Sequence, residues 1–560
     1  MVRRLLSSLT APIRGLTEEI RGLHQAAYLL AFLTLASQIL ALVRDRLFAG
    51  SFGAGELLDL YYAAFKIPDL VFTLIASLVS AYVLIPRIAK LDSYGVRRLL
   101  SHAASFLLIV GGLFALMLSL YTPSILRFAF PNLMESSYAG DFVSLTRILL
   151  LQPILLGLSG VITSVTQVHR RFALFALSPV LYNIGIIIGI LALYPLHGLM
   201  GIGYGVIFGA LLHVLIHIPV VMRLRLMPRL TVPSLSVVWS LVQDSIPRSL
   251  ALSFGALASF VLAILAGTTG TGGISVFTLA GNLEAVPLSL IGASYATAAF
   301  PVLAREMGEK RTDAFVATFL TAARHLIFWS AVALVLVVVL RAHIVRIIFG
   351  TGAFDWDDTR LAAAILGVLV IGLIAKGIVL LCSRAFYAAN RSWNPLLVQM
   401  VGLVVSVSCA LGALSLSAAY PIVGLFVEAL FRVENVPGAS VLLIALGATI
   451  GQIVMGVIAL MTLPSIMPNV GGTLLRPLLE GLGAAILGGA SAYGVLAFMG
   501  NIAPLTTLFA VFTQALLAGI VGLSVAAAVL ILLENREFRD VYESLRRLSF
   551  AKGLPPQSEL

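Results

Sequence analysis

Long apolar stretches separated by short polar loops are the dominant pattern along this chain. A helix needs roughly 20 apolar residues to cross the hydrocarbon core of a bilayer, and backbone that faces lipid must satisfy its own hydrogen bonds, as a helix does. The pattern therefore predicts an all-α membrane protein with about 14 transmembrane helices. The predicted spans are residues 25–43, 58–86, 99–121, 142–167, 173–194, 199–221, 240–266, 274–303, 314–340, 360–388, 394–416, 439–464, 477–499 and 504–533. A fifteenth apolar stretch, 418–431, is short and interrupted, and we interpret it as a re-entrant or interfacial segment.

Composition supports this class of protein and excludes others. The 560 residues are 60% hydrophobic and 11% charged, whereas charged residues make up about a quarter of a soluble domain. The net charge of +11 reflects basic loops between spans, so we expect no nucleic-acid partner. The two cysteines, Cys382 and Cys409, lie inside apolar segments, which argues against a disulfide framework or a zinc site. We expect no cofactor and no metal.

Arginine and lysine alternate between loops, and this alternation predicts the orientation. The loops and tails that fall on one side of the predicted topology are strongly basic, and the opposite side holds only seven basic residues: Arg44, Arg46, Arg127, Arg341, Arg346, Arg360 and Arg432. Cytoplasmic loops carry the excess of positive charge in membrane proteins. We therefore expect both termini to be cytoplasmic.

A weak internal repeat predicts how the spans are grouped. Ile85-Pro86-Arg87 ends the second span and Phe300-Pro301-Val302 ends the eighth, about 215 residues later. This spacing predicts two six-helix lobes in parallel orientation, with alternating access between them. The second and eighth spans contain Pro68 and Pro287 and are the expected moving elements. The expected parts are a cytoplasmic tail 1–24, an N-lobe 25–225, a C-lobe 240–465, two further helices in 466–533 and a cytoplasmic tail 534–560.

The most informative polar residues surround the loop between the first two spans. Arg44 and Asp45 end the first span, Asp59 opens the second, and the loop between them contains Phe52-Gly53-Ala54-Gly55. One interpretation is an extracytoplasmic gate in which Arg44 and the acids pair when the cavity is shut, with Arg44 also binding an anionic substrate. The other is an interfacial cap, with Asp59 as a helix N-cap and Arg44 extending to the interface.

Charges deeper in the spans are costly and usually face a cavity or a partner. Lys66 lies seven residues after Asp59 on the same helix face, and we expect it to face a cavity. Glu284 is the deepest carboxylate of the second lobe; it could neutralise Lys66, bind a coupling cation or occupy a wet cavity. Lys376 is a further buried cation. Gln38, Asn183 and Asn282 are intramembrane amides that either hold helices together or contact substrate.

Motifs of enzyme chemistry are absent from the sequence. It contains no P-loop, so the chain is not by itself an ATP-driven pump. His213 and His217 are spaced i, i+4, but no Cys, Asp or Glu in that segment completes a metal site, and helix packing explains them better. The glycine-rich run Gly267 to Gly273 lies between two spans and is interpreted as a flexible loop. We expect a transporter and not an enzyme.

The polar motifs resemble those of the lipid II flippase family, MurJ/MviN, of the multidrug/oligosaccharidyl-lipid/polysaccharide exporter superfamily. The resemblance rests on Arg44-Asp45, on residues 52–59 (FGAGELLD), on 64–70 (AFKIPDL), and more weakly on 350–355 (GTGAFD) and 385–388 (AFYA). It implies a flippase that moves a polyprenyl-pyrophosphate-linked peptidoglycan precursor, lipid II, from the inner to the outer leaflet of the bacterial cytoplasmic membrane. It also implies that the two C-terminal helices form a groove for the polyprenyl tail.

The resemblance implies functional residues as well. The substrate-binding set would be Arg44, Lys66, Asp59, Asn282 and Gln38. Arg44, Asp45 and Asp59 would form the gate, and Glu284 and Lys376 would supply a coupling or cavity charge. Cell-wall synthases would be further partners.

The chain also departs from the family pattern, which expects arginine where Gln38, Phe72 and Asn282 stand. The acidic residues of a sodium site are lacking too, since the seventh span has only Asp244, near its start. Three alternatives therefore stay open: a flippase for another lipid-linked oligosaccharide, a small-molecule antiporter of the same superfamily that depends on Glu284, and a transport-dead scaffold for cell-wall synthesis.

Overall fold

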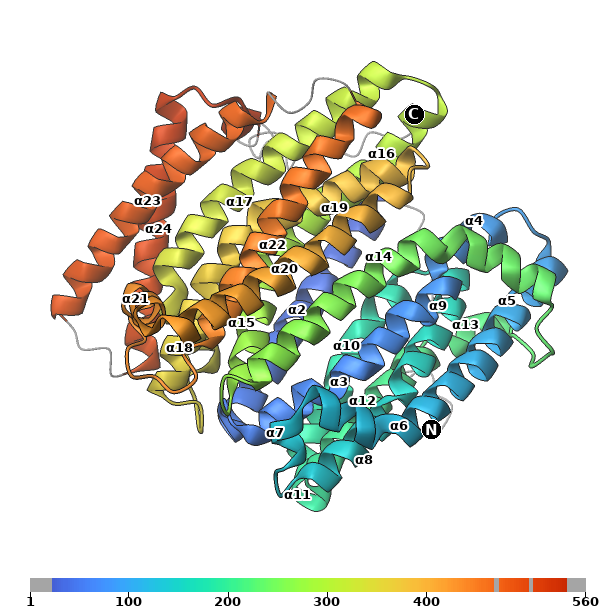
Figure 1. The fold of residues 1–560 in the computed structure, drawn as a ribbon. Helices are drawn as coiled ribbons and strands as arrows, with labels where there is room; N and C mark the ends of the chain where they lie inside the picture. The colour runs from blue at the N-terminus through green and yellow to red at the C-terminus, as the bar shows by residue number, and fades with distance from the viewer. Residues whose placement is uncertain (1–22, 468–472, 503–506, 541–560) are drawn as a thin grey trace, which may run out of the picture. The chain divides into compact units, whose positions relative to one another are not determined.

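The computed structural model describes residues 23–467, 473–502 and 507–540 (Figure 1). The predicted tails therefore fall outside it except for residues 23–24 and 534–540. All regular elements of the described residues are helices, without any strand, which confirms the all-α prediction. Thirteen of the described helical stretches are long and apolar enough to cross a membrane. Helix α2 (Leu23–Phe52) contains the first predicted stretch and is a further helix of 30 residues, so the predicted count of about 14 is close.

The chain divides into two compact units. Unit 1 comprises 1–279, 348–358 and 435–444, and unit 2 comprises 280–347, 359–434 and 445–560. Two short segments from the second half of the sequence, 348–358 and 435–444, thus pack with the first unit. The predicted lobes, 25–225 and 240–465, stay a prediction.

Unit 1 is built on close helix packing around α10. Gly185 of α10 and Gly189, the first residue of the π-helical segment that follows it, lie directly against Gly209 and Gly205 of α12. A Cβ at any of these positions would meet the backbone of the opposite segment. Small residues allow membrane helices to approach this closely. Besides α2, the helices of this unit are α3 (Glu56–Leu74), α4 (Ala81–Ile88), α5 (Ser93–Phe106), α6 (Gly112–Ala129), α7 (Pro131–Met134), α8 (Ala139–Leu149), α9 (Leu151–Val168), α10 (Phe172–Ile188), α11 (Tyr194–His197), α12 (Leu199–Leu215), α13 (Ile218–Arg223) and α14 (Leu235–Gly267).

Unit 2 has a core in which Leu303, Phe315, Phe319 and Phe386 are fully buried. The two C-terminal helices, α23 and α24, pack side by side as an antiparallel pair (Figure 1). Helix α15 (Gly273–Pro287) begins in unit 1 and continues into unit 2. The other helices are α16 (Ser294–Gly308), α17 (Thr312–Phe349), α18 (Trp356–Leu369), α19 (Leu373–Ala388), α20 (Trp393–Ala419), α21 (Pro421–Phe431), α22 (Val441–Thr462), α23 (Leu475–Ile502) and α24 (Leu508–Leu532).

The second and eighth predicted spans are both interrupted. In the second, α3 ends at Leu74, a 3₁₀ turn follows at Ala76–Val79, and α4 begins at Ala81. In the eighth, α15 ends at Pro287 and a π-helical segment, Leu288–Ala293, leads into α16. Proline and π-helical insertions are the usual causes of kinks in helices, and π segments often mark functional sites. The two spans singled out by the repeat are therefore irregular at mid-length.

Two smaller expectations concern the C-terminal half. The short stretch 418–431 contains α21, which at 11 residues is too short to span a bilayer as a helix.

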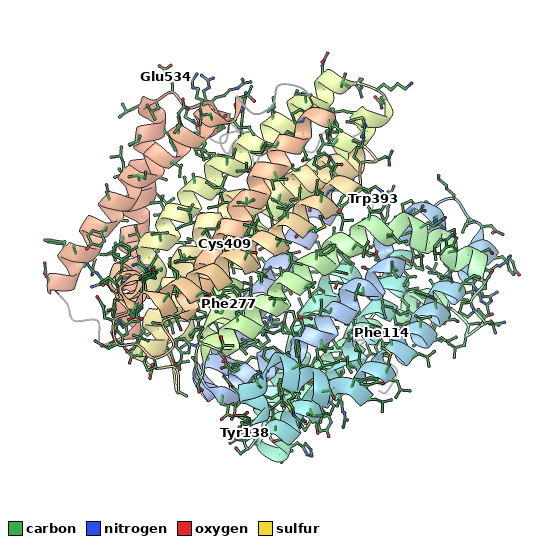
Figure 2. The ribbon with its side chains drawn as sticks, viewed as in Figure 1. Phe114, Tyr138, Phe277, Trp393, Cys409 and Glu534 are labelled. Atoms are coloured by element: carbon green, nitrogen blue, oxygen red, sulfur yellow. The ribbon has the colours of Figure 1, made fainter. Side chains whose placement is uncertain are left out.

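Cys382 and Cys409 are both free thiols; Cys382 is buried, and Cys409 (Figure 2) lies half-buried on α20. No disulfide joins them.

Candidate functional site

Arg44, near the end of α2, is held by two neighbours. Its Nε and Nη2 donate hydrogen bonds of 2.9 and 2.7 Å to Oδ1 of Asp45, and Nη1 donates one of 3.1 Å to Oδ1 of Asn183 on α10. The Asp45 side chain is 2% exposed and that of Arg44 is 19% exposed. A carboxylate and an amide thus hold one guanidinium, and part of its surface stays accessible. Because guanidinium carries five donors in a fixed fork, it can still offer donors to an anion.

Asp59, in the first turn of α3, caps a different helix from its own. The buried carboxylate accepts hydrogen bonds from the Gly272 backbone N–H at 2.7 Å and from the backbone N–H and hydroxyl of Ser275 at 2.7 and 2.6 Å. Gly272 and Ser275 flank the start of α15, where backbone N–H groups lack partners and the helix dipole favours a negative charge. Asp59 therefore fixes the start of α15 against α3.

Residues 50–55, which comprise the end of α2 and its connection to α3, pack tightly against two other segments of unit 1. Gly53 and Gly352 have φ values of +62° and +58°, which glycine adopts without steric cost. The Ala353 N–H donates to the Gly50 carbonyl at 2.9 Å, and a Cβ on Gly352 would collide with that same carbonyl. A Cβ on Gly272, whose φ is +86°, would collide with the carbonyl of Ala54. Only glycine fits at these close approaches.

Two polar side chains complete this arrangement. Oδ2 of Asp358 accepts a hydrogen bond from the Ala54 N–H at 3.0 Å, and Nη1 of Arg46 donates one of 2.9 Å to the Ile348 carbonyl. We call residues 44–59, 268–275 and 348–358 together the loop junction. Three segments that are far apart in sequence meet there, and each contact uses backbone groups that water would otherwise satisfy.

A second set of polar contacts joins the second span to α14, and we call it the polar zipper. Nζ of Lys66 donates to Oγ of Ser259 at 3.1 Å. Ser77 and Ser249 are joined through their hydroxyls at 2.7 Å, and the Ser245 hydroxyl donates to the Leu78 carbonyl at 2.8 Å.

The zipper ends at Arg87. Its guanidinium donates to the Ser240 hydroxyl and carbonyl at 2.8 and 2.7 Å and to Oδ2 of Asp244 at 2.5 Å. Asp244, the lone acid that the sequence offered for a sodium site on this helix, is thereby engaged by an arginine.

The loop junction and the Arg87 end of the zipper lie at opposite ends of one apolar stretch. That stretch runs from Glu56 to Ile88, and about 20 helical residues are enough to cross the hydrocarbon core. Asp59 and Arg87 therefore mark the two ends of one potential span. Each end is closed by hydrogen bonds to an element far away in sequence.

Unit 2 contains one buried ion pair from the predicted set. Nζ of Lys376, on α19, lies 2.6 Å from Oε2 of Glu284, on α15, and the side chains are 21% and 3% exposed. Glu284 and Lys376, which the sequence presents as two separate charges, thus form one ion pair. The second oxygen of Glu284, Oε1, has no hydrogen-bond partner in the described part of the chain.

The remaining predicted residues are less informative. Gln38 on α2 and Asn282 on α15 are both half-buried, and Phe72 on α3 is 39% exposed. His213 and His217 contact the hydroxyls of Ser159 and Thr163 on α9, at 2.7 and 2.9 Å, as helix packing predicts.

Several residues that form these polar contacts could not be identified from the sequence. The glycine-rich run 267–273, interpreted as a flexible loop, supplies Gly272 to Asp59. Ser275, Ser259 and Asp358 carried no signal by themselves, because a single serine or acid beside a membrane span has many possible roles. The sequence identifies Asn183 only as an intramembrane amide. Only knowledge of which distant segments pack together, at separations of more than a hundred residues, could have revealed these contacts.

Comparison with solved structures identifies the fold of the chain. The chain matches the solved structure described as lipid II flippase MurJ in an inward closed conformation, with a TM-score of 0.71 at 18% identity, over 91% of this chain and 100% of that one. It also matches an inward-facing multidrug resistance MATE transporter of the MOP superfamily, with a TM-score of 0.62 at 17% identity, over 80% and 100%. The chain therefore shares the fold of these two proteins.

Sequence comparison assigns the chain to one family. The family model described as "Lipid II flippase MurJ" matches residues 48–427, and the chain belongs to that family. It is 26% identical to the probable lipid II flippase MurJ of Bdellovibrio bacteriovorus over 71% of this chain and 77% of that one. It is 23% identical to the lipid II flippase MurJ of Burkholderia cenocepacia over 69% and 77%.

Proposed function

We propose that this chain is a flippase that moves lipid II from the inner to the outer leaflet by alternating access. The observation that carries the proposal is the partly accessible Arg44, paired with Asp45 and Asn183, in a chain of the lipid II flippase family. The cargo is a polyprenyl pyrophosphate, and a planar guanidinium binds phosphate oxygens in a bidentate manner. The chain is a transporter and catalyses no covalent step.

The proposed role of Arg44 follows from the exchange of its partners. Asp45 and Asn183 satisfy the guanidinium in the present conformation. A pyrophosphate offers more acceptor oxygens and more negative charge than this pair, so it can compete for the same donors. A cargo drives a conformational cycle only if it binds the two end states with different affinity. Exchange of Asp45 for pyrophosphate at Arg44 supplies such a difference.

The two polar sets of unit 1 are the proposed gates. The loop junction would have to open to release cargo on one side of the membrane, and the Arg87 end of the zipper would have to open to admit it on the other. The interruption of the second span between Leu74 and Ala81 gives that span a place to bend. Asp59 is therefore proposed as a gate residue, because its carboxylate is fully occupied by Gly272 and Ser275.

Lys66 is the proposed second cationic contact for pyrophosphate. It lies on the same span as Asp59 and is half-buried. Its hydrogen-bond partner is the Ser259 hydroxyl, and the Asp69 carboxylate on the same helix interacts with it electrostatically. Gln38 and Asn282 are proposed as neutral polar contacts in positions where the family pattern expects arginine. The proposed pyrophosphate site is therefore held by fewer positive charges than that pattern provides.

The expected location is the bacterial cytoplasmic membrane, with both termini cytoplasmic. The orientation rests on the excess of arginine and lysine in the loops of one side. Lipid II would be supplied at the cytoplasmic leaflet and withdrawn by cell-wall synthases at the outer leaflet, which are the proposed partners.

Transport by purified protein in proteoliposomes tests the proposal. Fluorescent lipid II should reach the outer leaflet in the presence of the wild-type chain and not with Arg44→Ala. Arg127→Ala removes an exposed arginine and serves as the matched control, which should transport normally. Transport of another lipid-linked oligosaccharide in place of lipid II would establish the related flippase. A Glu284-dependent movement of a small cation would establish the antiporter, and no transport by correctly inserted protein would favour the scaffold.

A further inference from the structure

Glu534, which follows the last residues of α24 (Figure 2), is an acidic residue in an unusual backbone position. Its φ is +49°, and its N–H bonds to the Ile531 carbonyl at 3.0 Å, closing the helix. The other described non-glycine residues with positive φ are all basic or asparagine: Arg170, Arg225, Lys310, Asn390, Arg432 and Asn435. Glu534 is the exception among the residues that the structure describes.

Two physical effects disfavour glutamate at this position. The left-handed conformation at a helix end suits glycine or asparagine, and an L-residue with a larger side chain adopts it at a cost. The carbonyl end of a helix also carries a partial negative charge, which favours lysine or arginine and repels a carboxylate. A residue that is unfavourable on both counts suggests a role for its side chain.

That side chain lines a cavity of about 610 Å³, whose wall is formed by Leu530, Ile531, Glu534, Asn535, Phe538 and Arg539. Glu534 and Arg539 place opposite charges in one cavity. Neither side chain forms an ion pair or a side-chain hydrogen bond with another described residue. The cavity thus offers an anion contact and a cation contact that are both available.

Neighbouring contacts hold the cavity in shape. The buried Asn535 donates from Nδ2 to Oε2 of Glu480 on α23 at 2.8 Å, and its Oδ1 accepts from the Phe538 N–H at 2.9 Å. Phe538 packs against the buried cluster formed by Phe328 of α17, Ala484 of α23 and Leu530 of α24. The chain reversal after α24 is therefore anchored to two other helices of unit 2.

The position of the cavity suits a membrane lipid. Helix α24 is a 25-residue apolar helix long enough to cross a bilayer, and the cavity begins at its last turn, where the sequence becomes polar. Ile531 and Leu532, beside the cavity, are 63% and 82% exposed. Apolar side chains below a charged cavity match a lipid with its headgroup above its acyl chains.

We propose that the end of α24 binds a phospholipid whose headgroup joins a phosphate to a primary ammonium, as in phosphatidylethanolamine. Arg539 binds the phosphate and Glu534 binds the ammonium, while the acyl chains lie over Ile531 and Leu532. A primary ammonium donates hydrogen bonds to a carboxylate, which the trimethylammonium of phosphatidylcholine cannot do. Phosphatidylglycerol would satisfy Arg539 and offer Glu534 only neutral hydroxyl donors, without a cation.

Native mass spectrometry of the full-length protein with defined lipids tests this proposal. The wild type should retain phosphatidylethanolamine at least threefold more often than phosphatidylcholine or phosphatidylglycerol. Glu534→Gln should remove this preference. Glu534→Gly should remove it as well, and because glycine suits the backbone at 534, loss in that variant cannot be attributed to misfolding. Glu309→Gln, at an exposed carboxylate after α16, is the matched control and should keep the preference.

Three results would overturn the proposal. One is an unchanged preference for phosphatidylethanolamine in both Glu534 variants. Another is preferential retention of phosphatidylglycerol that depends only on arginine, which would define a general cationic patch for anionic lipids. The third is displacement of the bound lipid by a polyprenyl phosphate at equal concentration, which would assign the cavity to the cargo. None of these results depends on transport, so the proposed flippase function is tested separately.

Discussion

Asp59 at the start of α3 accepts two hydrogen bonds from Ser275, through its backbone N–H and its hydroxyl, 216 residues away in sequence. Asp59→Asn replaces one acceptor oxygen with an NH₂ group and leaves an N–H of Gly272 or Ser275 without a partner. A buried unsatisfied donor costs about 1–3 kcal/mol. We expect a lower melting temperature in detergent and reduced transport. Ser275→Ala removes only the hydroxyl contact and should have a smaller effect; equal effects would contradict the capping role.

Gly352 tests the steric part of the loop junction. Gly352→Ala places a Cβ against the Gly50 carbonyl, whereas Gly198→Ala, at a similar φ of +56°, meets nothing within 4 Å. The control should lose only the conformational cost of a non-glycine residue at φ +56° and ψ −143°, about 1–3 kcal/mol. Gly352→Ala should lose distinctly more, as measured by thermal unfolding of the two variants. A control as unstable as Gly352→Ala would show that packing at the junction contributes little.

The polar zipper predicts a reversible lock. The hydroxyls of Ser77 and Ser249 lie 2.7 Å apart, so cysteines at these positions should form a disulfide in a background that lacks Cys382 and Cys409. If the second span must separate from α14 during the cycle, oxidation of Ser77→Cys/Ser249→Cys should stop lipid II transport and reduction should restore it. Each single cysteine variant should transport lipid II at the same rate under oxidising and reducing conditions. Full transport by the cross-linked protein would exclude this separation.

The Glu284–Lys376 pair predicts strong coupling between two substitutions. Lys376→Met leaves the Glu284 carboxylate, 3% exposed, without its cation, and removing one member of a buried pair costs about 3–5 kcal/mol. Adding Glu284→Gln to Lys376→Met removes the orphaned charge and should recover much of that loss. Melting temperatures of the two single variants and the double variant give the comparison. Additive losses would show that the two groups do not stabilise each other.

Arg44→Lys separates charge from geometry at the proposed cargo site. Lysine keeps the positive charge but cannot bond Asp45 and Asn183 at once through a planar fork. We expect Arg44→Lys to fold normally and to transport lipid II at least tenfold more slowly than the wild type. Asn183→Ala removes one neutral partner and should reduce transport less. Wild-type rates in Arg44→Lys would show that a point charge is sufficient.

Apolar periodicity was enough to predict the helical class and nearly all span positions, because the bilayer fixes the length and composition of a spanning helix. The prolines anticipated the irregular geometry only in the eighth span, where α15 ends at Pro287. Pro68 lies inside the unbroken α3, and the second span is interrupted only after Leu74. Polar motifs such as Arg44-Asp45 and 52–59 could be recognised because charged residues are rare in this chain, at 11%.

The partners of those motifs could not be predicted in the same way. Asp59 has the composition and position of an ordinary N-cap, and only the fold shows that it caps α15 through Ser275. Glu284 could be matched to any buried cation, and the structure selects Lys376. Glu534 gave no signal in the sequence, because its significance lies in a backbone angle and a cavity that no local pattern encodes.

Complementation is the most direct test of the central claim that this chain moves lipid II. A bacterial host depleted of its own lipid II flippase should grow and keep its shape when it expresses the wild-type chain. The host should lyse when it expresses Arg44→Ala at the same level in the membrane. Lysis with the correctly inserted wild-type chain, or rescue by Arg44→Ala equal to the wild type, would contradict the account.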